Sequence, residues 1–184
     1  MSFPNILNIS EEETFNTYTA ERVPVGSLAR VEDGRLYRFV ENGGVALIAS
    51  TMVQARLEVV ADTTGQAVGT LAAGVLVLTG VGSTNNNFAI DVLKYGYVFT
   101  DTAADLNPAY RIKSNTLITA AATTGTITLF SPTVAAIAAA TTISYMRSPW
   151  RDIIVTVATT PTAKVLGVAV NAIALDAFGW VCSR

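Results

Sequence analysis

Apolar and polar residues alternate in short runs along most of this chain, which is typical of half-buried β-strands. The clearest alternation lies in residues 35–40, between the turn signals Asp33-Gly34 and Asn42-Gly43-Gly44. Asp-Gly and Asn-Gly favour the positive φ of tight hairpin turns. Further β-rich runs, separated by Gly, Asn, Asp or Pro, cover residues 52–60, 75–78, 97–100, 110–113, 126–130, 153–157 and 166–181. Many short strands at spacings of about 8–12 residues predict an all-β protein, a β-barrel or β-sandwich-like fold with little helix.

The same pattern divides the chain into three regions. Residues 1–22 show no sustained period and predict an extended N-terminal arm, either disordered or ordered by a partner. Residues 23–60 and 147–184 predict a β-rich base, and residues 61–146 predict a β-rich insert. The pattern leaves open whether this insert is a separate lobe or continues one barrel. Within it, residues 133–146 form either one short helix or a loop that leads into a strand.

The composition is unusually apolar and poor in charge for a β-protein. The chain of 184 residues is 51% hydrophobic and 14% charged, against a typical charged share of about 25%. Its net charge is −2 and no segment is basic, which argues against nucleic acid as a partner. Its longest uncharged stretch, Ser114–Met146, is broken by Thr, Ser and Pro, so no membrane-spanning helix is expected. A charge-poor surface is often covered by other chains, and this favours an assembly subunit.

Candidate chemistry is sparse. Histidine is absent, which removes Ser-His-Asp and Cys-His mechanisms and the commonest metal ligand. The single cysteine, Cys182, forms no internal disulfide, and the first residues lack the pattern of a signal peptide. No phosphate-binding glycine motif occurs. We therefore predict no catalytic residue, no cofactor and no metal site, and expect that the chain is not an enzyme.

The carboxylates fit turn and capping chemistry better than catalysis. They occur beside turn residues, at Glu32-Asp33, Asp91, Asp101 and Asp105. Residues 101–108 (DTAADLNP) offer oxygen ligands for calcium but lack the spacing of a calcium loop.

Two polar or aromatic stretches have alternative interpretations. Asn85-Asn86-Asn87, followed by Phe88, form either a plain surface loop or a polar contact loop. Tyr95, Tyr97 and Phe99 share one face of a strand, where they pack in a core or interface or stack on sugars or bases.

Four motifs occur in order over most of the chain: GRLYRFV at 34–40, YRIKSN at 110–115, GVA at 167–169 and FGW at 178–180. Together they resemble virion structural proteins of tailed bacteriophages, in particular head decoration (cement) proteins. The resemblance implies a non-enzymatic protein that binds the outside of the major capsid shell and clamps neighbouring capsomers. It also implies a homo-oligomer, with a trimer favoured, on the capsid exterior of the virion after synthesis in the host cytoplasm. Neither nucleic acid nor a membrane is an expected partner.

Exposure and polarity favour the arm and the Asn-rich loop as contacts, and the closing aromatic strand suits an interface centre. The expected contact residues are Phe3, Ile6, Phe15, Tyr18, Asn85, Asn86, Asn87, Phe88, Phe178 and Trp180. For Trp180, packing within the core of one barrel is the alternative.

Two other functions stay open at this point. One is a tail- or fibre-associated adhesin that binds host carbohydrate, with Tyr95, Tyr97 or Trp150 in its groove. The other is a carboxylate-dependent glycan hydrolase, which requires two carboxylates close together in a cleft.

Overall fold

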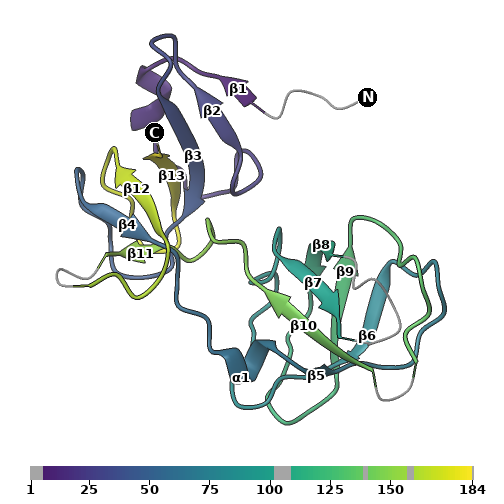
Figure 1. Cartoon of the computed structure of the whole chain (residues 1–184). Helices are drawn as coiled ribbons and strands as arrows, with labels where there is room; N and C mark the ends of the chain where they lie inside the picture. The colour runs from purple at the N-terminus through teal and green to yellow at the C-terminus, as the bar shows by residue number, and fades with distance from the viewer. Residues whose placement is uncertain (1–5, 102–108, 139–140, 157–159, 184) are drawn as a thin grey trace. The chain divides into compact units, whose positions relative to one another are not determined.

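The computed structural model describes residues 6–101, 109–138, 141–156 and 160–183. The chain separates into two compact units, the first from Met1–Leu57 and Pro149–Arg184 and the second from Glu58–Ser148 (Figure 1). The sequence pattern placed these boundaries at 60/61 and 146/147. Both units are built from β-strands, which confirms the all-β prediction. The described helices are a single 3-10 turn, η1 (Glu12–Phe15), and a single α-turn, α1 (Val60–Thr63).

Unit 1 contains a seven-stranded sheet with the order β1-β2-β3-β13-β12-β4-β11. All neighbouring strands are antiparallel except β1 and β2, which are parallel. The strands are β1 (Ile6–Asn8), β2 (Leu28–Arg30), β3 (Leu36–Glu41), β4 (Met52–Gln54), β11 (Ile154–Val155), β12 (Val165–Ala169) and β13 (Phe178–Cys182).

Strand β13 lies at the centre of this sheet and is buried on both faces. It pairs with β3 over five positions, from Phe178 opposite Glu41 to Cys182 opposite Tyr37. On one face Val181 joins an aliphatic core with Val40 and other buried residues. On the other face the buried Phe39 ring stacks on Phe178 with 5.9 Å between ring centroids and meets Trp180 edge-on at 5.1 Å. The apolar closing strand is thus covered by its own chain.

The N-terminal residues complete this burial, and an extended arm is not confirmed. Residues 6–8 form edge strand β1, and Tyr18 exchanges two backbone hydrogen bonds with Phe178, at 2.9 and 2.8 Å. The Tyr18 ring lies 6.0 Å from that of Phe39. Because the aromatic face of the sheet needs a cover, the described N-terminal segment packs against it.

One of the two predicted turns is correct. Asp33-Gly34 joins β2 to β3 as a hairpin, with Gly34 at φ +92° and its amide bonded to the carbonyl oxygen of Val31 at 3.0 Å. This positive φ is readily available only to glycine.

The predicted turn at Asn42-Gly43-Gly44 is wrong. Strands β3 and β4 are not neighbours in the sheet. Asn42 is instead fully buried, and its side-chain amide donates to the carbonyl oxygens of Val45, Ile173 and Ala174 at 2.9–3.0 Å. Its side-chain oxygen accepts from the amide of Gly44. The asparagine therefore links two distant loops.

Unit 2 contains a six-stranded antiparallel sheet with the order β5-β10-β7-β8-β9-β6. Backbone bonds from Gly82 to Ala67 (3.1 Å) and from Gly69 to Thr79 (2.8 Å) draw its two edges together, so the sheet curls into a partly closed barrel. The strands are β5 (Gln66–Ala67), β6 (Val77–Val81), β7 (Tyr97–Thr100), β8 (Ala109–Asn115), β9 (Gly125–Leu129) and β10 (Thr142–Met146).

Side chains alternate in and out of this barrel along each strand. The inward set forms a separate hydrophobic core that includes Val98, Ile112, Ile127, Leu129, Ile143 and Tyr145. Residues 133–138, one part of the segment with two interpretations, contain no helix. Ile137 pairs there with Leu71, and β10 begins at Thr142, so this segment is a loop that leads into a strand.

We predict that Asn42→Asp lowers the free energy of unfolding by about 3 kcal/mol, because it places a carboxylate against buried carbonyl oxygens and removes their donor. Urea denaturation at pH 7 measures this. The matched exchange at an exposed position of the same unit, Asn8→Asp, should change the free energy by less than about 0.5 kcal/mol. Equal effects of the two exchanges would contradict the role given to Asn42.

Candidate functional site

An open groove of about 860 Å³ lies in unit 1 beside the β2–β3 hairpin. The chain leaves β1, bonds the amide of Ile9 to the carbonyl oxygen of Arg30 at 3.1 Å, and then turns into η1. The groove lies between this segment and the hairpin. Its walls are formed by Asn8, Ile9, Ser10, Glu11, Arg30, Val31, Glu32, Asp33 and Arg35.

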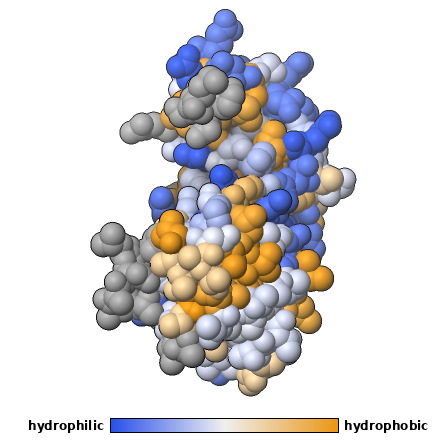
Figure 2. Space-filling model, turned by 90° about the vertical axis from the view of Figure 1, so that its right-hand side faces the viewer, coloured by the Kyte–Doolittle hydropathy of each residue, from blue (hydrophilic) through white to orange (hydrophobic). Residues whose placement is uncertain are grey.

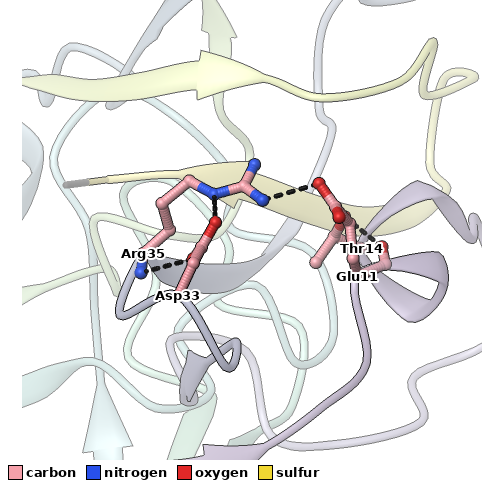
Figure 3. Close-up of polar contacts among 4 residues, drawn as sticks. All are labelled: Glu11, Thr14, Asp33 and Arg35. Atoms are coloured by element: carbon pink, nitrogen blue, oxygen red, sulfur yellow. Dashed lines mark hydrogen bonds and ion pairs between the residues drawn. The ribbon is translucent and has the colours of Figure 1, made fainter.

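Arg35 links the two walls of the groove. Its guanidinium contacts the carboxylate of Glu11 and that of Asp33, each at 2.6 Å (Figure 3). The Asp33 carboxylate also accepts from the backbone amide of Arg35 at 3.0 Å. On the other wall, the Thr14 hydroxyl donates to the carbonyl oxygen of Glu11 at 2.6 Å and anchors the start of η1. Arg35 therefore fastens the N-terminal segment to the hairpin.

These contacts limit the chemistry of the groove. The backbone amide of Arg35, and then its guanidinium, hold the pKa of Asp33 below its ordinary value. The pKa of Arg35 is raised, first by its hydrogen bond to Glu11 and then by that to Asp33. A carboxylic acid that donates a proton near neutral pH needs a raised pKa instead. The arrangement at Asp33 thus suits a structural ion pair rather than a catalytic acid.

A second ion pair lies at the end of β3. Arg151 approaches Glu41 at 2.9 Å, and both side chains are mostly buried. Burial raises the pKa of Glu41, and the positive charge of Arg151 opposes that shift. Among the described residues, no group of three or more His, Cys, Asp or Glu side chains is placed to hold a metal ion. The calcium loop considered for residues 101–108 lies almost entirely outside those residues.

The expected contact residues fall into different environments. Phe3 lies outside the described residues, whereas Ile6 and Phe15 are exposed and Tyr18 is half-buried. Asn85, Asn86 and Asn87 are exposed in one loop of unit 2, where Asn87 accepts from the amide of Ala120 at 2.8 Å. The structure does not bring this loop and the N-terminal segment into one compact unit.

Three of the expected contacts are corrected by the structure. Phe88, Phe178 and Trp180 are only 3%, 8% and 4% exposed. Phe88 packs edge-on against Tyr145 at 5.4 Å in the barrel core, and the other two pack on Phe39. Their rings fill the interior of the two units because each inner face needs large apolar side chains. They are not available as surface contacts.

A different set of side chains forms an apolar surface in unit 1. Five large apolar residues, which we call the unit 1 apolar surface, are 39–75% exposed: Val45, Ile48, Met52, Val168 and Leu175. Their backbones adjoin, since Leu47 and Ile173 exchange hydrogen bonds at 2.9 and 3.1 Å and Met52 pairs with Val168. Sequence reasoning missed this surface because both segments are apolar on consecutive positions, so alternation does not show which side faces outward.

Unit 2 also carries apolar and aromatic side chains on its outside. Figure 2 shows apolar residues gathered over unit 2 on the face turned to the reader. Tyr97 is 41% exposed and Phe99 half-buried on the outer side of β7, while Val98 points into the core. Tyr97 and Phe99 thus lie outside the barrel core.

Comparison with known proteins finds no matching family model, no matching curated protein and no matching solved structure. In the part of the chain that the structure describes, no helix is long and apolar enough to cross a membrane.

The ion pairs of Arg35 with Glu11 and Asp33 lead to a prediction about acid titration. Because the folded-state pKa of Asp33 is lowered, its stabilising contacts are complete above the ordinary aspartate value of about 3.9 and are lost as pH falls through the lower folded value. Arg35→Gln should move the titration midpoint of the Asp33 carboxyl upward, toward that ordinary value. NMR titration of the carboxyl carbon measures it, with Arg56→Gln as the control. An unchanged midpoint in Arg35→Gln would show that the guanidinium does not hold this carboxylate.

Proposed function

We propose that this chain is a non-enzymatic structural protein of a bacteriophage virion. It binds the outer capsid surface through the unit 1 apolar surface and stabilises contacts between capsomers. Its partner is the major capsid protein, and copies of the chain assemble with one another, with a trimer as the favoured state. Neither nucleic acid nor a membrane takes part. The observation that carries the proposal is the cluster of exposed large apolar side chains in a chain with few charges.

The chain segments that form this surface are depleted of charge. Residues 42–55 contain no charged residue, and residues 165–183 contain only Asp176. The core of a protein–protein interface shows this depletion, whereas an ordinary solvated surface carries interspersed charges. Exposed apolar side chains on adjoining segments of this kind therefore fit a protein partner.

The energetics suit a protein that acts in many copies. Each 100 Å² of apolar surface that becomes buried contributes roughly 2.5 kcal/mol before the costs of association. A contact of modest size at one position gives weak binding by itself. Repeated over a capsid, and joined through an oligomer, modest contacts add up to a large avidity. Such a mechanism uses contact area and requires no catalytic group.

The experiment is cosedimentation of the purified chain with expanded, empty phage heads. We expect saturable binding of the unchanged chain. Val45→Glu combined with Ile48→Glu should weaken binding at least tenfold, because each glutamate would be desolvated in the contact. The matched control is Val134→Glu, an exchange at a residue of unit 2 that is 74% exposed, as Val45 is 75% exposed.

The outcomes separate two claims. Absence of binding by the unchanged chain would contradict the capsid function. Binding that survives the double glutamate exchange, or that is lost equally in Val134→Glu, would contradict the assignment to the unit 1 apolar surface. Circular dichroism and thermal melting of each variant establish that the fold is kept.

A further inference from the structure

The barrel wall of unit 2 carries a second surface that the proposed capsid contact does not use. It combines exposed aromatic rings with basic side chains from β7, β8 and the adjoining turns. We call it the aromatic–basic surface, and it consists of Lys94, Tyr95, Tyr97, Arg111, Lys113 and Phe130. It contains two of the three lysines in a chain whose net charge is −2.

Strand register brings these side chains to one face. Tyr97 on β7 lies opposite Arg111 on β8 and, on its other side, opposite Met146 on β10. Tyr97 is 41% and Phe130 47% exposed, and Arg111 and Lys113 are exposed as well. Ile112 between them points into the core. Both rings and both cations therefore face outward.

The guanidinium of Arg111 is held by aromatic rings. Its central carbon lies 5.3 Å from the ring centroid of Tyr95 and 5.2 Å from that of Phe130. These two rings are stacked, with 6.2 Å between centroids and 18° between planes. The ammonium of Lys94 lies 4.9 Å from the Tyr95 ring. A guanidinium positioned in this way loses little conformational freedom when it binds a ligand.

Arg111 contacts aromatic rings, whereas several other arginines of the chain contact carboxylates. Arg35 and Arg151 form ion pairs with carboxylates. Within the described residues, Arg111 is paired with no carboxylate, and its neighbours there are rings.

The backbone under this surface is closely packed and hydrogen-bonded. A Cβ at Gly96 would lie 2.0 Å from the carbonyl oxygen of Met146, so β7 and the end of β10 approach each other as closely as only glycine allows. The amide of Tyr95 bonds to the carbonyl oxygen of Ile112 at 2.9 Å, and that of Phe130 to Arg111 at 3.0 Å. The rings therefore project from fixed positions, as a binding site requires.

We infer that the aromatic–basic surface binds a carboxylated carbohydrate. The exposed faces of Tyr97 and Phe130 suit the C–H face of a sugar ring. The planar fork of Arg111 suits a carboxylate, which it binds through two parallel hydrogen bonds, and the exposed Lys113 adds positive charge. This binding is a function separate from attachment to a capsid.

Two features favour a sugar over other anionic partners. Strands β7, β8 and β9 are inner strands of the sheet, so their backbone groups are already paired and a peptide cannot be added as a strand. Nucleic acid binding draws most of its affinity from many phosphate contacts, and three cations on a chain of net negative charge supply few of them.

The test uses the full chain and isothermal titration calorimetry with defined probes. These are an alginate oligosaccharide and an oligosialic acid as carboxylated sugars, a dextran oligosaccharide of equal length as the neutral sugar, poly-glutamate as charge without sugar, and a twelve-residue oligothymidylate. We expect saturable binding of a carboxylated sugar, at least tenfold tighter than binding of dextran, poly-glutamate or oligothymidylate.

Variants assign the binding to this surface. Tyr97→Ala and Arg111→Lys should each weaken binding of the carboxylated sugar at least fivefold, the second because lysine keeps the charge but loses the fork. Phe15→Ala, an exposed aromatic of unit 1, and Lys164→Gln, an exposed lysine of unit 1, are the matched controls and should leave binding unchanged. Thermal melting establishes that each variant is folded.

The inference is overturned if neither carboxylated sugar binds, or if dextran, poly-glutamate or oligothymidylate binds equally well or better. It is also overturned if the control variants lose as much affinity as Tyr97→Ala and Arg111→Lys. None of these results bears on cosedimentation with phage heads, so the two proposals fail or stand separately.

Discussion

Unit 1 depends on the pairing of strand β13 with strand β3. These strands are separated in sequence by the whole of unit 2, yet they form the centre of the seven-stranded sheet. Strand β13 joins the two halves of the sheet, because β3 pairs with one of its edges and β12 with the other. Strands β4 and β11 connect to the rest of the sheet only through β12. This pairing buries Phe39, Phe178 and Trp180 on one face, and this face in turn orders the N-terminal segment through Tyr18. Contacts of such long sequence separation carry a large loop-closure entropy and are typical of slowly folding proteins.

Charged side chains and exposed apolar side chains have different roles in this chain. In unit 1, carboxylates clasp Arg35 and Arg151, and these pairs hold loops and segments together. The five side chains of the unit 1 apolar surface lie on the outside of the same unit, in segments with few charges. In unit 2, Arg111 lies against aromatic rings rather than a carboxylate. The two surfaces proposed for binding are therefore formed by exposed apolar side chains in unit 1 and by aromatic rings with basic side chains in unit 2.

The sequence predicted correctly those elements that depend on neighbouring residues alone. The Asp33-Gly34 hairpin and the strand at Tyr97–Thr100 could be derived from turn chemistry and alternation. The role of Asn42 could not, because an Asn-Gly pair has the same local preference whether it forms a hairpin or reaches carbonyl groups 131 and 132 residues away. The burial of Phe178 and Trp180 depends on a cover supplied by residues near the other end of the chain.

The candidate surfaces were still harder to predict. The five residues of the unit 1 apolar surface come from segments that are apolar on both sides of each strand, so their outward direction follows only from pairing. Tyr97 was recognisable as one of an alternating aromatic set, but its alignment with Arg111 depends on the register of β7 and β8. The groove at Arg35 required the N-terminal segment to be packed, where the sequence pattern predicts an extended arm.

Cryo-electron microscopy of expanded, empty heads saturated with the chain tests the central claim most directly. We predict additional density at regular lattice positions on the outer shell, with the unit 1 apolar surface against the capsid protein. Heads without such density, at concentrations where the chain is in large excess, would contradict it.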